Sequence, residues 1–211
     1  MPRRSIIRPQ GTTDRSAYFL VDGWLASSML LADGERQILK LHLPGDMLGS
    51  TSMCVEDAID TLMALTPVTV RKVPLAPLGQ LIVTNPRIAM FLLLSAQKER
   101  VALMDLLASN SRTSPIARLA FLLLNLHQRL SIVGQAGSDE LEIAINQEQL
   151  GDIVGLTPVH VNRVLRQMTN DGLIERHRRQ IRIIDFERLR ELSKIPLRDM
   201  SIASSWQHIV A

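Results

Sequence analysis

The sequence predicts an α+β protein in which an amino-terminal β-roll is followed by a long helix and a mostly helical domain. Three observations predict it: short β-rich runs up to Val73, a stretch without glycine or proline between Pro86 and Pro115, and a second helical pattern interrupted at Gly155. The 211 residues suffice for two modest domains, each with its own core. We expect a β-roll over 1–85, a long dimerisation helix over 86–110, and a carboxy-terminal domain with a tail over 111–211.

The predicted β-roll depends on short runs separated by turn residues. The runs are "AYFLV", "WLASSML", "QILKLHL", "AIDTLMAL" and "VTVRKV", and the turns are "DG" at 22–23 and 33–34, "PGD" at 44–46, and Pro67. "LLADGERQIL" predicts a hairpin, because Asp-Gly supplies positive φ between two strand-like flanks.

The long helix, "PRIAMFLLLSAQKERVALMDLLAS", has more apolar surface than a single core-facing stripe requires. We therefore expect it to pair with its copy in a homodimer. The alternative is that both faces are buried within one chain. Lys98 and Asp105 interrupt any simple heptad seam, so the register stays open. A second helix, "SPIARLAFLLLNLHQRLSIV", begins at the N-cap Ser114 and is followed by a surface loop over 134–140.

Composition excludes several classes of protein. The single cysteine, Cys54, rules out an intramolecular disulfide and cannot alone hold zinc or an iron-sulfur cluster. No apolar run approaches the roughly 20 residues of a membrane span. "MPRRSII" has two arginines but lacks the apolar region of an export signal, so we expect a cytoplasmic protein.

The stretch "NQEQLGDIVGLTPVHVNRVLRQM" predicts a helix-turn-helix. Its first helix runs from about Gln147 to Val154 and ends at Gly155, which suits a left-handed turn. Thr157 is the N-cap of the second helix, which we place at about 157–168. Small Gly151 lets the two helices cross closely. The alternative is an ordinary helical hairpin.

The second helix has a core face and a reading face. The core face comprises Val161, Val164, Leu165 and Met168, and the opposite face comprises Val159, Arg163 and Arg166, flanked by His160 and Asn162. Arg163 can donate two hydrogen bonds to guanine, and Val159 can contact only a thymine methyl. Asn162 can bind adenine or a phosphate, and His160 can contact a phosphate or water. Thr157, at the start of the helix, can bind a phosphate oxygen.

Positive charge concentrates around this helix. From His160 to Arg182 there are six arginines against two acids, although the whole chain carries only +3. Such an excess is expected of a surface that binds phosphates, although a solvated basic face is the alternative. "DGLIERHRRQIRIID" predicts a two-stranded wing whose tip presents basic residues to the DNA backbone: Arg176, His177, Arg178 and Arg179.

These motifs together resemble the Crp/Fnr family of bacterial transcription regulators. "GWLASSMLLADGERQILKLHLPGDMLG" is similar to the roll signature of the family, and "QEQLGDIVGLTPVHVNRVLRQMTNDGLIE" to its DNA-binding signature. The resemblance covers nearly the whole chain. It implies a cyclic-nucleotide-binding-like roll, a long dimerisation helix and a winged helix-turn-helix, acting as a homodimer on palindromic double-stranded DNA.

The chain departs from the family pattern in four ways. Only about 17 residues precede "YFLV", so either the start is shortened or the roll is incomplete. Members that bind cyclic AMP clamp its phosphate with an Arg-Ser pair, whereas "GSTSMCVEDAIDTLMAL" contains no arginine, which argues against cyclic AMP. The single cysteine excludes the family's iron-sulfur cluster. Many members have glutamate where this chain has Val159.

Haem, which some members bind, would need axial ligands. The candidates are His42, Met47, Met53 and Cys54, but packing or surface roles suit each of them better. No cofactor is therefore expected, and the sequence does not specify an effector.

The leading hypothesis is a homodimeric, sequence-specific transcription regulator whose partners are double-stranded DNA, a second copy of the chain and RNA polymerase, with no membrane. The alternative is a sensor of a cyclic nucleotide or another small ligand in which DNA binding is secondary. An enzyme is not expected, because the sequence shows no Ser/His/Asp grouping, paired metal ligands or phosphate-binding glycine loop.

Overall fold

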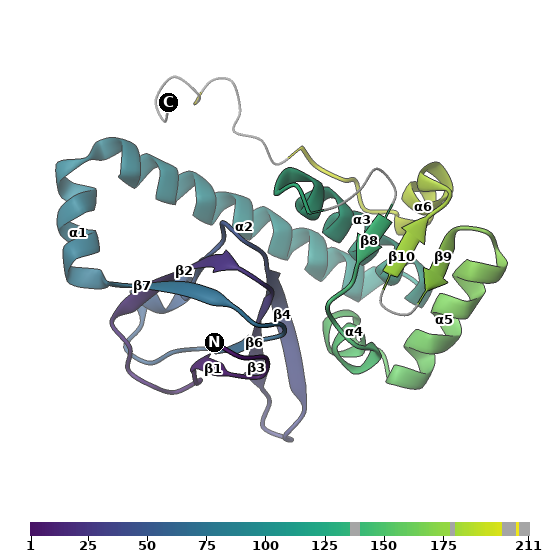
Figure 1. Ribbon diagram of the computed structural model, residues 1–211, viewed down its shortest axis with the longest axis horizontal. Coiled ribbons are helices and arrows are strands. Elements are labelled where there is room, and N and C mark those ends of the chain that lie inside the picture. The colour runs from purple at the N-terminus through teal and green to yellow at the C-terminus, as the bar shows by residue number, and fades with distance from the viewer. Residues whose placement is uncertain (136–139, 178–179, 200–205, 207–211) are drawn as a thin grey trace.

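The computed structural model describes residues 1–135, 140–177, 180–199 and 206. A β-roll lies beneath a long helix, and a second domain of helices and one short sheet lies at the far end of that helix (Figure 1). The predicted α+β class is confirmed.

The roll consists of two antiparallel sheets. One has the strand order β1 (Ile6–Arg8), β6 (Thr61–Ala64), β3 (Leu25–Leu30) and β4 (Arg36–His42), and the other β5 (Met47–Leu48), β2 (Ser16–Asp22) and β7 (Thr69–Pro74). A short 3₁₀ helix, η1 (Ser50–Cys54), follows β5. The two sheets enclose a core to which both contribute: Tyr18, Leu20, Leu25, Leu48, Leu62, Ala64 and Val68.

The predicted hairpin joins β3 to β4. Gly34 has φ of 86°, and the Leu31 amide donates to the Glu35 carbonyl at 2.8 Å, which closes the turn. Several elements were not expected from the sequence, among them β1 and α1. Strand β1 is only three residues long, and helix α1 (Leu75–Thr84) contains Pro77 and Gly79, which are typical of turns.

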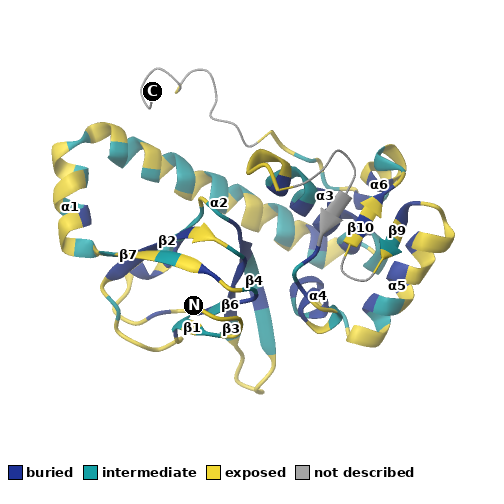
Figure 2. Cartoon of the chain, viewed as in Figure 1, coloured by how far each residue is buried: buried dark blue, intermediate teal, exposed yellow. Residues whose placement is uncertain are grey.

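Helix α2 (Pro86–Arg112) is the longest element. Its 27 residues give a length of roughly 40 Å at 1.5 Å per residue. The Asn85 side chain caps it by accepting from the Arg87 amide at 3.2 Å. Only Ser109 is buried along the whole helix, which is therefore exposed over much of its surface (Figure 2). No single helix of the described residues could span a membrane; α1 and α2 pass the length and composition test only as a pair bent by 115°.

The carboxy-terminal domain is built around α3 (Pro115–Ile132), which is capped by Ser114 as predicted. The other elements are α4 (Gln147–Val154), α5 (Pro158–Asn170), α6 (Phe186–Ser193) and a sheet of order β8 (Glu140–Glu142), β10 (Gln180–Ile183) and β9 (Ile174–His177). Residues 136–139 of the predicted surface loop lie outside the described part of the chain.

One apolar cluster connects the roll to this domain. It contains Ile38 and Leu41 of β4 together with Leu123 of α3 and Ile153 of α4, all of which are buried. Since apolar packing of this kind is short-ranged, the roll and the carboxy-terminal domain lie in direct contact in this structure.

Candidate nucleic-acid interface

Helices α4 and α5 form the predicted helix-turn-helix. At the start of α4 a capping box forms: Asn146 accepts from the Gln149 amide at 2.8 Å, and Gln149 accepts from the Asn146 amide at 3.0 Å. The helix ends at Gly155, whose φ of 66° lies in the left-handed region. The Thr157 hydroxyl then accepts from the His160 amide at 3.3 Å and starts α5.

The crossing of the two helices requires a glycine. A Cβ atom added to Gly151 would lie 2.3 Å from the carbonyl oxygen of Leu156, which is closer than real Cβ atoms approach backbone. The Leu156 amide also donates to the Gly151 carbonyl at 3.1 Å. Gly151 therefore brings α4 into direct contact with the turn before α5.

The two faces of α5 separate as the sequence predicts. Its core face, comprising Val161, Val164, Leu165 and Met168, is at most 4% exposed. On the other face, Val159 is 80% exposed and Arg163 and Arg166 are also exposed, while His160 and Asn162 are half-buried. Thr157, at the helix start, is exposed as well.

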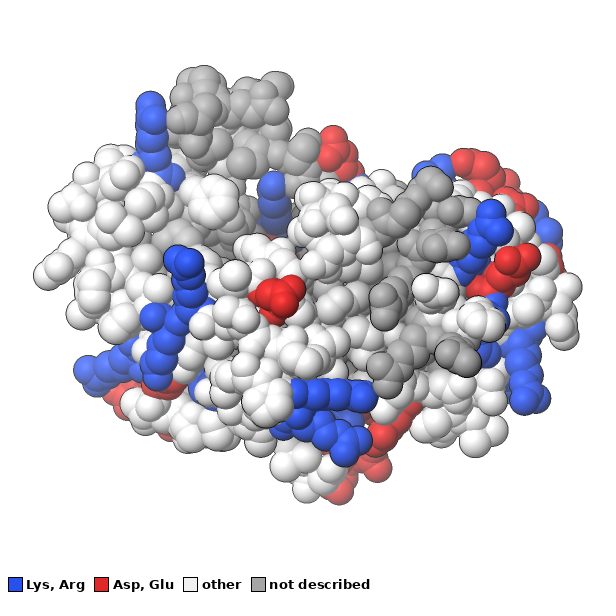
Figure 3. All heavy atoms as spheres, viewed as in Figure 1, with Lys and Arg blue, Asp and Glu red and all other residues white. Residues whose placement is uncertain are grey.

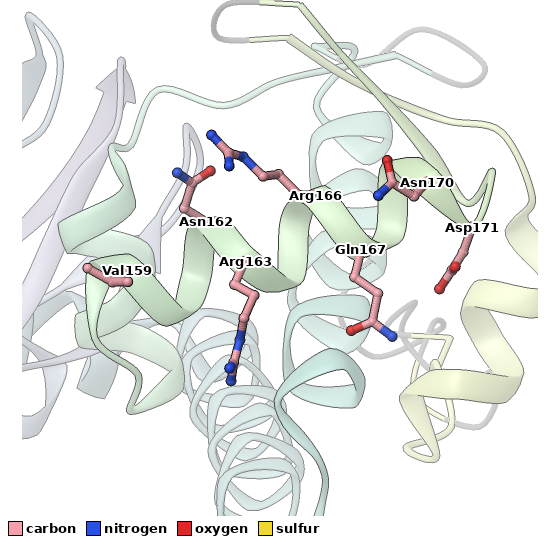
Figure 4. Close-up of a pocket in the computed structure, with 7 residues that line it drawn as sticks. All are labelled: Val159, Asn162, Arg163, Arg166, Gln167, Asn170 and Asp171. Atoms are coloured by element: carbon pink, nitrogen blue, oxygen red, sulfur yellow. The ribbon is translucent and has the colours of Figure 1, made fainter.

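The outward side chains border a shallow hollow of about 480 Å³. Asn162, Arg166 and Asn170 project to one side of α5, and Arg163 and Gln167 project to the other (Figure 4). The surface continues along the helix to Asp171. Gln167 and Asn170 were not among the residues expected here, although the helical spacing from Arg163 and Arg166 could have identified both.

Arg163 has a partner of its own on this surface. Its guanidinium lies 2.8 Å from Nε2 of His160, one turn earlier in α5. This contact holds the guanidinium against the first turn of the helix. Arg163 must exchange it for a base contact if it is to read guanine in the way that the sequence predicts.

The wing is present as strands β9 and β10. Arg176 and His177 lie within β9 rather than at the tip, because the strand extends further than the sequence pattern indicates. Arg178 and Arg179 lie outside the described residues. Figure 3 shows basic side chains at the edge where α5 and β9 lie, with acidic side chains close to them.

Comparison with known proteins identifies both halves of the chain. A family model described as a cyclic nucleotide-binding domain matches residues 1–85, and one described as a Crp-like helix-turn-helix domain matches residues 117–192. The transcriptional activator protein FnrA of Stutzerimonas stutzeri is 27% identical over 176 residues, which are 83% of this chain and 72% of FnrA. The structure of FixK2 from Bradyrhizobium japonicum, 25% identical, superposes with a TM-score of 0.83 over 93% of this chain and 96% of FixK2.

The chain belongs to the Crp/Fnr family of transcription regulators. A second relative, the transcriptional regulatory protein btr of Bordetella pertussis, is 28% identical over 170 residues, which are 81% of this chain and 70% of btr. Such proteins bind DNA through the helix-turn-helix, so this Crp/Fnr regulator is a DNA-binding protein.

The roll of this Crp/Fnr regulator contains a cation that was not expected from the sequence. Arg8 of β1 is 1% exposed and forms an ion pair with the buried Asp60, and its guanidinium lies against Gly49, the residue before η1. Two of its nitrogens, Nε and Nη1, have no hydrogen-bond partner. The stretch "GSTSMCVEDAIDTLMAL" contains no arginine of its own, but Arg8 supplies one beside Gly49. The pairing of β1 with β6 brings Arg8 there from a distant part of the sequence.

The described residues contain no group of three or more His, Cys, Asp or Glu side chains that could hold a metal ion. The four residues considered as haem ligands differ in their surroundings. His42 is buried, Met47 is half-buried, and Met53 and Cys54 are exposed.

Proposed function

We propose that this regulator acts in the cytoplasm as a homodimer on a two-fold palindromic operator, with α5 of each copy in the major groove. The observation that carries the proposal is the division of α5 into a fully buried face and an opposite face of polar, basic and apolar side chains that the fold does not bury. An exposed helix of this kind, backed by a second helix, fits the major groove.

The side chains of α5 suit different contacts. Arg163 donates to guanine after leaving His160, and Val159 packs against a thymine methyl because it has no polar group to offer. The Thr157 oxygen accepts from the helix amide, which leaves its hydroxyl proton for a phosphate oxygen. Asn162 and Arg166, on the opposite edge of the hollow, are placed for a base or phosphate contact.

The wing adds contacts to the DNA backbone. Arg176 and His177 lie on β9 and are the proposed contacts in the described part of the wing. Arg178 and Arg179, which lie outside the described residues, are included in the proposal from the sequence. Contacts of this type add affinity and salt sensitivity without selecting a sequence.

The exposed side of α2 is the proposed dimer interface. Leu93, Met104 and Leu107 are 53%, 59% and 69% exposed, and their spacing places them within about 60° of one another around the helix. Asp105, which interrupts the heptad pattern in the sequence, bonds instead to Arg198 at 2.8 and 3.1 Å. Its charge is thus neutralised within the chain.

The proposal includes no cyclic AMP, no iron-sulfur cluster and no haem. Arg8 is the cation beside Gly49, and Asp60 already neutralises it. A cyclic phosphate at this place would meet the Asp60 carboxylate, and two buried anions repel each other strongly. Although Nε and Nη1 of Arg8 have no hydrogen-bond partner, the Arg8–Asp60 pair carries no net positive charge to attract a cyclic phosphate, and the residues present therefore do not fit one. Contact with RNA polymerase is part of the proposal, because FnrA is named a transcriptional activator.

A small-ligand sensor is the second candidate function. A cavity of about 320 Å³ lies between β4, α2 and α3, with apolar walls that include Leu92, Leu103 and Leu126. Lys40 and Glu99 form an ion pair at 2.9 Å on its wall. A volume of this size suits a small organic molecule. The relatives are transcription regulators, so we propose no catalytic role for this cavity.

Selection of binding sites from a random pool of duplex DNA tests the proposal. The full chain is used, with and without a metabolite extract from cells. We expect enrichment of two identical half-sites related by a two-fold axis. No enrichment, or enrichment of sites without symmetry, would contradict the homodimer on a palindrome. Enrichment that requires the extract would favour the sensor candidate.

A further inference from the structure

The orientation of the helix-turn-helix depends on contacts that cross from the roll. Between the end of α2 at Arg112 and the start of α3 at Pro115 only two residues connect the long helix to the DNA-binding domain. A covalent joint this short still allows rotation about its backbone dihedral angles. Non-covalent contacts must therefore fix the direction in which α5 points.

Several of these contacts converge on the end of α4. The last carbonyls of a helix have no partner within the helix itself. Here the Asp152 carbonyl accepts from Gln37 of β4, the Ile153 carbonyl from Asn110 of α2 at 3.0 Å, and the Val154 carbonyl from Arg118 of α3 at 3.1 Å. Three donors from three different elements thus satisfy three consecutive carbonyls. We call this group, with the Arg36–Asp152 ion pair, the α4 junction.

An ion pair strengthens the contact with the roll. Arg36, at the start of β4, donates to the Asp152 carboxylate through Nε at 3.0 Å and through Nη2 at 2.7 Å. The two side chains are 35% and 20% exposed, so the pair is partly shielded from solvent. Because two nitrogens bind one oxygen, the geometry restricts the angle between the hairpin and α4.

A second ion pair lies further along the same boundary. Asp46, in the turn after β4, accepts from Arg129 of α3 at 2.8 Å, and Nδ1 of the buried His42 lies 3.6 Å from the same oxygen. Burial alone would raise the pKa of Asp46, but the His42 ring and the charges of Arg129 and Lys40 hold that pKa well below its usual range. Asp46 therefore stays ionised, and it keeps α3 attached to the roll.

The α4 junction is coupled directly to the reading surface. Val154 is followed by Gly155 and by the turn that packs on Gly151, and Thr157 then starts α5. This packing leaves no room for α5 to move without α4. A rotation of α4 about its own end would therefore carry the reading face of α5 with it.

We propose that the α4 junction sets the direction of the recognition helix relative to the dimer helix, and thereby the half-site spacing that the regulator accepts. Arg36, Gln37 and Asn110 are positioning residues: they lie on the roll and the long helix, and act on DNA recognition through α4. The inference depends on the proposed function, because spacing has meaning only for a dimer on a palindrome.

Binding of the full chain to a series of palindromes tests the inference. The duplexes carry the selected half-sites with their separation changed in steps of one base pair, and an isolated half-site serves as reference. For Arg36→Ala and for Gln37→Ala we expect affinity for the preferred spacing to fall about tenfold while affinity for the isolated half-site is unchanged, so that the preference among spacings flattens. Arg71→Ala, an exposed arginine of β7, is the matched control and should keep the wild-type preference.

Two further comparisons separate positioning from loss of folding. Asp152→Ala should resemble Arg36→Ala, because both remove the Arg36–Asp152 ion pair and the other acid near Arg36, Glu148, is 3.9 Å away. The two changes together should therefore cost little more than Arg36→Ala alone. Reversal of the pair, Arg36→Asp with Asp152→Arg, should restore the spacing preference. Thermal unfolding of each variant verifies that the domains remain folded.

The inference is overturned if the single variants keep the wild-type spacing preference, or if they weaken the isolated half-site as much as the palindrome. It is also overturned if the reversed pair behaves like the single variants. A wild-type chain that binds the palindrome no better than the half-site would instead contradict the proposed function itself.

Discussion

At the scale of single residues, α5 places side chains of opposite character within one turn. Val161 is fully buried, whereas Val159, two positions earlier, is 80% exposed. Arg163 lies on the same side as Val159 and bonds to His160. An apolar and a cationic side chain side by side can distinguish a thymine methyl from the acceptors of guanine. The reading surface thus combines shape and hydrogen bonding within a few residues.

Replacement of Arg163 tests its assignment to guanine. We expect Arg163→Ala to weaken binding to the selected operator by about 1–3 kcal/mol and to relax the preference at one base-pair position, because the bidentate contact is lost. The measurement is the affinity for a panel of operators in which each position is changed in turn. Arg163→Lys should also relax that position, because lysine lacks the planar fork.

The control for Arg163 is the effect on DNA of unrelated sequence. Affinity for random duplexes should fall much less than affinity for the operator. An equal loss on both would assign Arg163 to phosphate contact and remove it from base recognition. Arg71→Ala should change neither value, since Arg71 lies on the roll.

At the scale of elements, local signals made the helix-turn-helix predictable. The end of α4 at Gly155 and the start of α5 at Thr157 and Pro158 were both expected, because a left-handed glycine and an N-cap act within a few residues. The hairpin at Gly34 follows from the same kind of signal. The division of α5 into two faces follows from helical periodicity alone.

Elements that depend on distant partners were not predictable. Strand β1 has three residues, and its pairing with β6 joins Ile6 to Met63, from a distant part of the chain. The position of Arg8 beside Gly49 results from that pairing, so no local sequence pattern predicts it. The same holds for the α4 junction, where Gln37 and Asp152 meet only because the roll and the DNA-binding domain pack together.

Replacement of Gly151 tests the helix crossing. In Gly151→Ala the new methyl group would lie 2.3 Å from the Leu156 carbonyl oxygen, so the turn must move. We expect the free energy of unfolding to fall by about 1–3 kcal/mol and operator affinity to fall with it. Denaturant unfolding followed by circular dichroism gives the first quantity.

A matched glycine shows that the effect belongs to the crossing. Gly79 lies within α1, and a Cβ atom added there would have no neighbouring atom within 4 Å. Gly79→Ala should therefore leave stability unchanged or raise it by up to about 1 kcal/mol through helix propensity. A Gly151→Ala protein as stable as wild type would show that the helices can separate without cost.

At the scale of the whole molecule, α2 contacts very different surroundings along its length. Lys40 and Ser50 of the roll reach Glu99, and Arg198 of the carboxy-terminal segment reaches Asp105, at 2.8 to 3.2 Å. On another side of the helix, Leu93 and Met104 remain exposed. Both domains thus contact α2 on one side, and apolar residues are exposed on another. This arrangement suits a helix that brings two copies of the chain together.

Charge on the exposed side of α2 tests the homodimer. Met104 and Leu107 are more than half exposed in the single chain, so Met104→Glu with Leu107→Glu should leave the fold intact. In a dimer these positions would place carboxylates opposite each other and remove apolar area worth roughly 1.5–3 kcal/mol for each buried side chain. We expect sedimentation to show a dimer for the wild type and a monomer for the variant at the same concentration, with operator affinity reduced to that of an isolated half-site.

Leu30→Glu, at an exposed leucine of β3, should remain dimeric. A doubly charged variant that stays dimeric, or a wild-type chain that is monomeric, would show that the two copies do not pair through this side of α2.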